Sequence, residues 1–119
     1  MFNNKKNNQP TALDNRISAK RGELVEAENR LKNAAEKVII ANGVISLYPE
    51  GADKNHAIED AEDYKYLLLC AIGVYDGLLR DYKELLKKTE ERKTTLSYPT
   101  AYCSSHEVIE RVYRNFYKK

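Results

Sequence analysis

Apolar residues recur every seven positions in the first part of the chain and predict one long helix. A heptad of this kind places an apolar stripe against a partner helix, and alanine at the second seam position lets that partner approach closely. Thr11 to Asp14 has the form of a capping box, so we expect the helix to begin at 11 and to run to about 47. The large seam residues are Ile17, Leu24, Leu31, Val38 and Ile45, and the smaller seam is formed by Lys20, Ala27, Ala34 and Ala41.

A second long helix is predicted after a turn that contains Pro49 and Gly51. Acidic residues fill its first turns and basic residues its last turns, a distribution that favours the helix dipole. We expect it to span residues 54–93, about 60 Å. Its inward row is predicted to contain Ala61, Leu68, Tyr75 and Tyr82, with Ile72, Leu79 and Leu86 in the neighbouring row.

A short third helix is predicted over residues 104–117, after a linker that contains Pro99. We expect this helix to cover part of the middle of the second helix, with its basic residues outward. The side chains expected to dock are Val108, Ile109, Val112 and Phe116. The fold prediction is therefore all-α: a long antiparallel, coiled-coil-like helical hairpin with a short C-terminal helix, forming a three-helix bundle. Residues 11–119 are predicted to form a single domain, preceded by a disordered polar tail at 1–10.

The segment 66–79 is the most informative part of the chain because it is apolar nearly all the way round. A surface helix needs only one apolar stripe, so we expect a homo-oligomer contact or a protein partner to cover the remaining side. The alternative is that the other two helices suffice. Gly73 and Gly77 lie four residues apart, which favours a close helix crossing. The interface candidates are Leu67, Leu69, Gly73, Tyr75, Gly77 and Leu78.

Charge and hydropathy restrict the function classes. Charged residues make up 32% of the 119 positions, yet the net charge is only +2, which by itself indicates neither nucleic acid nor an anionic membrane. The apolar run is shorter than the roughly 20 residues of a membrane span, and the N-terminus lacks the apolar region of a signal peptide. Cys70 is expected to pack as a small hydrophobe, and Cys70 and Cys103 form no disulfide framework. We therefore expect a cytoplasmic protein.

No catalytic, cofactor-binding or metal-binding residue is predicted. Cys103 and His106 have a metal-type spacing, but the other soft ligands, His56 and Cys70, are separated by about 20 Å along one helix. The acids from Glu59 to Asp63 read as a solvated helix start, or as an acidic docking patch. The glycines do not cluster into a phosphate loop. We expect neither an enzyme nor a small-molecule substrate.

The expected function is that of a helical protein–protein interaction module: an adaptor, an assembly subunit or a stoichiometric inhibitor acting through its hairpin. The Asn- and Lys-rich, Trp-free composition suits a low-GC bacterium or one of its phages. The alternative is a small nucleic-acid-associated protein, because base stacking and phosphate contact need interleaved aromatic and basic residues. The residues that would serve it are Arg111, Arg114, Tyr117, Lys118 and Lys119.

Overall fold

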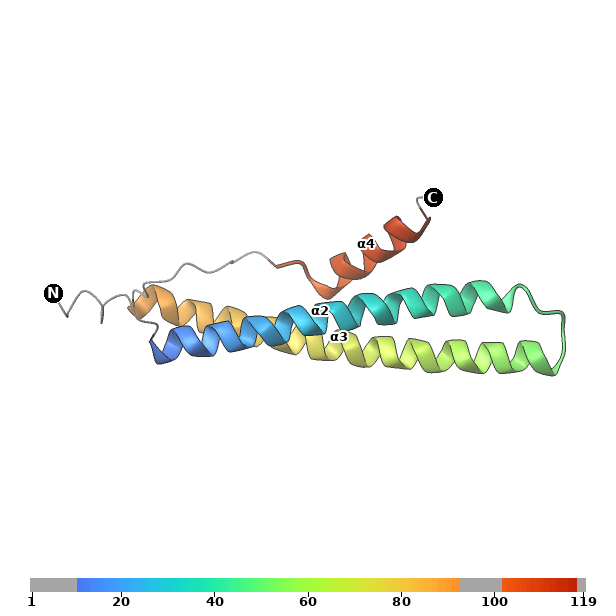
Figure 1. The fold of residues 1–119 in the computed structure, drawn as a ribbon, viewed down its shortest axis with the longest axis horizontal. Coiled ribbons are helices and arrows are strands. Elements are labelled where there is room, and N and C mark those ends of the chain that lie inside the picture. The colour runs from blue at the N-terminus through green and yellow to red at the C-terminus, as the bar shows by residue number, and fades with distance from the viewer. Residues whose placement is uncertain (1–10, 93–101, 118–119) are drawn as a thin grey trace.

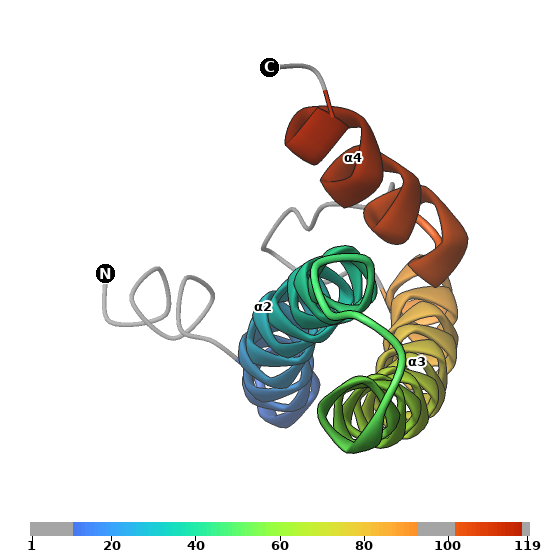
Figure 2. The ribbon, with the colours of Figure 1, turned by 90° about the vertical axis from the view of Figure 1, so that its right-hand side faces the viewer.

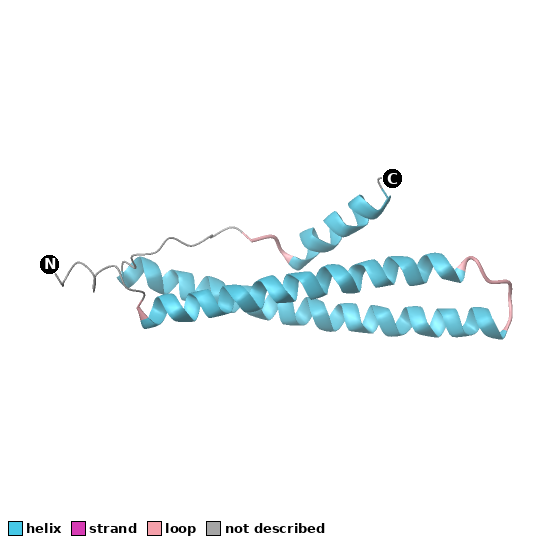
Figure 3. Cartoon of the chain, viewed as in Figure 1, coloured by secondary structure: helices cyan, strands magenta, loops and turns pink. Residues whose placement is uncertain are grey.

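The computed structural model describes residues 11–92 and 102–117, and these contain helix and loop only (Figure 3). The helices are α2 (Ala12–Ile45), α3 (Ala52–Arg92) and α4 (Ser105–Tyr117). α2 and α3 run antiparallel as a long hairpin, and α4 lies along its side (Figure 1). The predicted all-α hairpin with a short third helix is confirmed, and each helix begins and ends within two residues of its predicted bounds. The predicted tail at 1–10 lies outside the described residues.

A reciprocal capping box fixes the start of α2. The Thr11 hydroxyl oxygen accepts a hydrogen bond from the Asp14 backbone N–H at 3.1 Å. In return, the Asp14 carboxylate accepts the Thr11 backbone N–H at 2.9 Å and the Thr11 hydroxyl at 3.0 Å. Two backbone donors that the helix cannot satisfy itself are thereby paired, and the Asp14 side chain is fully buried while doing so.

We expect Thr11→Ala to lower the free energy of unfolding by about 1 kcal/mol, because the substitution removes the cap while leaving Asp14 in place. Urea denaturation followed by circular dichroism measures the change. Thr11→Ser retains the hydroxyl and should stay near the wild-type value. Equal stability of the alanine and serine variants would contradict a stabilising cap.

The hairpin turn depends on one glycine. Gly51 has a φ of 146°, a backbone conformation that residues with a Cβ rarely adopt. The first turn of α3 then closes with the Asn55 N–H donating to the Gly51 carbonyl at 3.1 Å. The chain thus reverses direction over a few residues, which brings the two long helices side by side.

The core lies in the seam between α2 and α3. The heptad leucines Leu24 and Leu31 are fully buried, and so are Tyr75 and Tyr82 of α3. These four side chains belong to one apolar cluster that also contains Ala27. The small alanine seam of α2 leaves room for the two tyrosine rings, so the predicted inward rows are the ones that pack.

α4 packs mainly on α2, whereas the prediction was that it covers part of the middle of α3; there it only shares apolar clusters with Leu68 and Tyr75. Val112 is 8% exposed and packs against Ala35 and Ile39 of α2. The physical reason is that Ala35 and Ile39 offer an apolar surface beside the seam. α4 diverges from the hairpin toward its C-terminus (Figure 1), which leaves Phe116 42% exposed rather than docked as predicted.

Candidate interaction surface

An uncovered apolar surface runs along the middle of α3. Tyr66, Leu67, Leu69 and Val74 are 67%, 54%, 65% and 53% exposed. Residues three and four apart share a helix face. Cys70, Gly73 and Gly77 therefore continue the line that begins at Tyr66. The larger side chains of Leu67, Leu69 and Val74 flank this line. We call this surface the outer face of α3; its residues are Tyr66, Leu67, Leu69, Cys70, Gly73, Val74 and Gly77.

The outer face points away from the rest of the described hairpin. The opposite side of α3 carries Tyr75, Leu79 and Tyr82, which are buried in the seam with α2. The ribbon seen along the hairpin shows α2 beside α3 and α4 above them, with neither helix on the side of α3 farthest from α2 (Figure 2). Neither of these two helices therefore covers the outer face.

The predicted interface candidates differ in how far their side chains are exposed. Leu67, Leu69 and Gly73 are exposed, and Gly77 is half-buried. Leu78 is also half-buried and packs against the main core. Tyr75 was predicted as an interface residue, and this is wrong, because its side chain is fully buried.

Tyr75 has a structural role instead. Its hydroxyl donates to the Cys103 carbonyl at 2.6 Å, which ties α3 to the segment leading into α4. Tyr82 supports the same segment, with its ring centroid 5.2 Å from that of Tyr102 in an edge arrangement. Burial, with smaller contributions from the negative charge of Glu28 and other neighbours, raises the pKa of Tyr75 to about 12.

The glycines mark no helix crossing within the chain. No heavy atom lies within 4 Å of a Cβ built at Gly73 or at Gly77. No described helix crosses α3 at these positions, because both glycines lie on the side of α3 away from α2, and a crossing with another chain stays a prediction. They leave a shallow strip of bare backbone along the outer face, bordered by Leu67 and Val74 on one side and Leu69 on the other.

Cys70 lies in this strip as an exposed free thiol. The prediction that it packs as a small hydrophobe is wrong within the described chain, because Cys70 lies on the same exposed face of α3 as Tyr66 and not on the face of Leu68. Cys103 is also free, and half-buried.

Opposite charges flank the two ends of the outer face. Residues 59–65 contain four acidic residues and one basic residue, a net charge of −3. Residues 80–88 contain four basic residues and two acidic ones, a net charge of +2. Asp63 and Arg80 are exposed charged residues at the two ends of the line from Tyr66 to Gly77, and Asp76, also exposed, lies at the border seven residues after Leu69. The face is therefore apolar in the middle and oppositely charged at its ends.

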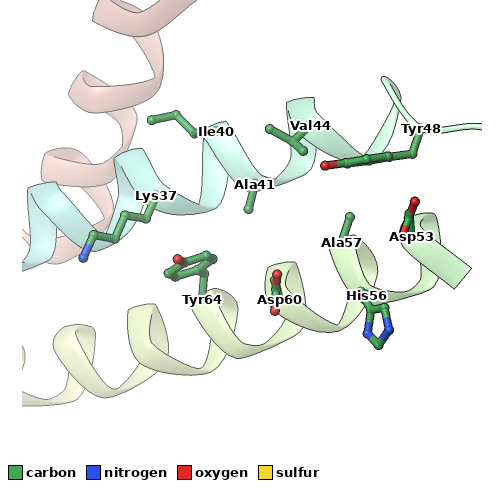
Figure 4. Close-up of a pocket in the computed structure, with 10 residues that line it drawn as sticks. All are labelled: Lys37, Ile40, Ala41, Val44, Tyr48, Asp53, His56, Ala57, Asp60 and Tyr64. Atoms are coloured by element: carbon green, nitrogen blue, oxygen red, sulfur yellow. The ribbon is translucent and has the colours of Figure 1, made fainter.

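Apart from the outer face, a groove lies between α2 and α3 beside the hairpin turn (Figure 4). It is an open groove of about 550 Å³. Ala41 of α2 faces Asp60 of α3 across it, Ala57 points into it from α3, and Tyr48 and Tyr64 border it, whereas His56 points away (Figure 4). Lys37, Asp53 and Asp60 also line the groove, so its lining mixes charged and apolar side chains.

The residues of the nucleic-acid alternative lie on the outer part of α4, with Lys118 and Lys119 outside the described residues. Tyr117 is 70% exposed, and its ring contacts those of Tyr113 and Phe116. Arg111 is exposed, while Arg114 lies 3.8 Å from the Glu110 carboxylate. The aromatic and basic groups thus share one helix end, with acidic residues among them.

Within residues 11–92 and 102–117, no group of three or more His, Cys, Asp and Glu side chains is placed to hold a metal ion. None of the helices described there has a stretch long and apolar enough to cross a membrane.

No protein-family model matches this sequence, and no curated protein or solved structure matches it either.

Proposed function

We propose that this protein is a non-enzymatic interaction module that binds a protein partner through the outer face of α3. The observation that supports the proposal is that Tyr66, Leu67 and Leu69 are each more than half exposed on one helix. The seam with α2 is already filled without them. Single exposed apolar residues are ordinary, but a contiguous set on a helix favours a docking surface.

The energetics support a helix as the bound element. Burying apolar surface contributes roughly 25 cal/mol per Å², so covering several half-exposed leucine and tyrosine side chains is worth several kcal/mol before the costs of association. A partner helix fits a shallow strip with raised borders. An adaptor, an assembly subunit and a stoichiometric inhibitor all act through such a contact.

We propose that the protein is cytoplasmic, because Cys70 and Cys103 are free thiols and the cytoplasm keeps thiols reduced.

A photo-reactive amino acid tests the surface directly. We expect a benzophenone side chain at Leu69 to give a specific covalent adduct with a protein in cells, because that position lies at the border of the outer face. The matched control places the same group at Glu26, an exposed position of α2. Mass spectrometry identifies the adducts. Equal cross-linking from both positions, or none from Leu69, would overturn the proposal.

Charged substitutions provide the second arm. For this arm the benzophenone is placed at Val74, which is 53% exposed on the same face and should give the same adduct. Leu67→Lys combined with Leu69→Lys should abolish that adduct while changing the free energy of unfolding by less than about 1 kcal/mol, since both side chains are exposed. Retention of the partner by this variant, folded as wild type, would place the contact elsewhere on the molecule.

The exposed rings of Tyr113, Phe116 and Tyr117 beside Arg111 support nucleic-acid binding as a second candidate function. It ranks second because Glu107 and Glu110 lie on the same short helix. If it holds, single-stranded nucleic acid should bind in a fluorescence titration with an affinity that falls steeply as salt rises. The absence of binding tighter than about 10⁻⁴ M at physiological salt would exclude it.

A further inference from the structure

We propose that the outer face of α3 binds the same face of a second copy of this chain, with the two α3 helices antiparallel. This inference rests on the proposed function and names the partner. Three features of α3 favour this occupant: the charge distribution along the helix, the symmetry of the apolar span and the bare glycine strip.

The charges at the two ends of the outer face determine the orientation. In an antiparallel pair centred on the apolar span, the segment 80–88 with a net charge of +2 lies beside residues 55–63 of the second copy, which carry a net charge of −4 with His56 neutral. In a parallel pair, the two acidic segments would lie together, and so would the two basic ones. The antiparallel arrangement also aligns the helix dipoles favourably. Such a contact is isologous and closes as a two-fold dimer.

The apolar span determines the register. The central line of the outer face extends from Tyr66 to Gly77. A dimer whose two-fold axis passes through the midpoint of this line covers the apolar surface of each copy with that of the other. Each Tyr66 ring then lies over Gly77 of the second copy, and each Cys70 lies opposite Gly73. Asp63 of one copy faces Arg80 of the other at both ends.

The glycines gain a role in this pairing that they lack within the chain. The distance between two packed helices depends on the side chains at their contact. A strip with no Cβ at Gly73 and Gly77, and with open space in front of both, lets a second backbone approach closely. Glycine is less favourable in a helix than alanine, and a close dimer contact offsets that cost.

The size of the surface determines the expected strength. A single helix contact over about three turns is smaller than the roughly 800 Å² per partner of a standard interface. We therefore expect a reversible dimer with a dissociation constant on the order of 1–100 µM.

Sedimentation equilibrium from low-micromolar to millimolar protein tests the pairing on the full chain. We expect a monomer–dimer equilibrium in the wild type. Gly73→Leu should weaken it at least tenfold because the new side chain separates the two helices, yet it should not destabilise the monomer, where that position faces open space. The matched control is Gly22→Leu on α2, which also meets open space and should leave the equilibrium unchanged.

Charge exchange tests the orientation. Asp63→Lys and Arg80→Glu should each weaken the dimer about fivefold, since each places like charges together at both ends. The double variant should restore wild-type association because it only reverses the sense of each pair. Single variants without effect would indicate a parallel dimer or another surface, and would overturn the inference.

The remaining outcomes separate the inference from the proposed function. A strict monomer at millimolar concentration overturns the inference. If the Leu69 photo-reactive variant then still gives its specific adduct with a different protein, the proposed function stands. If it gives none, both fail. An unchanged or tighter dimer in Gly73→Leu would show that the glycine strip is not the contact.

Discussion

Leu24→Ala is expected to lower the free energy of unfolding by about 3–5 kcal/mol. The Leu24 side chain is fully buried in the main cluster of the α2–α3 seam. Truncation loses the transfer free energy of the removed methyl groups and leaves a cavity that rigid neighbouring helices only partly close. Urea denaturation at low protein concentration, where the monomer dominates, measures the change.

Leu69→Ala is the matched control, because the chemical change is the same and Leu69 is 65% exposed. We expect it to change monomer stability by less than about 0.5 kcal/mol. Two similar losses would mean that the outer face of α3 is covered within the monomer. A small loss for Leu24→Ala would place the core elsewhere.

The hairpin could be predicted because its seam obeys one period. Ile17, Leu24 and Leu31 follow each other at intervals of seven and are all fully buried. The turn was equally clear, since a proline and a glycine lie between two long patterned segments. Strong local rules acting in the same direction make such elements readable from the sequence alone.

The outer face of α3 was harder to place because periodicity fails where every side of a helix is apolar. Tyr66 and Tyr75 are chemically identical, and one is exposed while the other is buried. A signal was nevertheless present: Tyr66 shares its row with Glu62 and Arg80, whereas Tyr75 shares its row with Leu68 and Tyr82. Charges at both ends of a row indicate the solvent side even when its middle is apolar.

The position of α4 could not be predicted from its own stripe. An amphipathic helix of this length can bury Val108 and Val112 against either long helix. The choice depends on the surface that the hairpin offers after it has formed, here Ala35 and Ile39. The buried hydrogen bond from Tyr75 to the Cys103 carbonyl is likewise a tertiary contact between residues 28 positions apart, with no local signature.

Tyr75 should make the protein sensitive to alkaline pH. Its pKa is raised from 10.0 to about 12 in the folded state, chiefly because burial disfavours the phenolate. Below pH 10 the phenol is neutral in both states, and its contribution is fully present. As the pH rises from 10 to 12, the unfolded chain releases the proton first, so stability is lost by up to about 2–3 kcal/mol. Urea denaturation at a series of pH values between 8 and 12 measures this loss.

Tyr75→Phe separates this contribution from that of the other tyrosines. The variant should be about 1–2 kcal/mol less stable at pH 7, because the Cys103 carbonyl loses a 2.6 Å hydrogen bond. Between pH 10 and 12 its stability should fall less steeply than that of the wild type; some slope remains because burial also raises the pKa of Tyr82. Tyr66→Phe, which removes a hydroxyl from an exposed ring, serves as the control and should retain the wild-type slope. An unaltered alkaline slope in Tyr75→Phe would show that this phenol is solvated in the folded protein, and that the tie between α3 and the segment leading into α4 is open in solution.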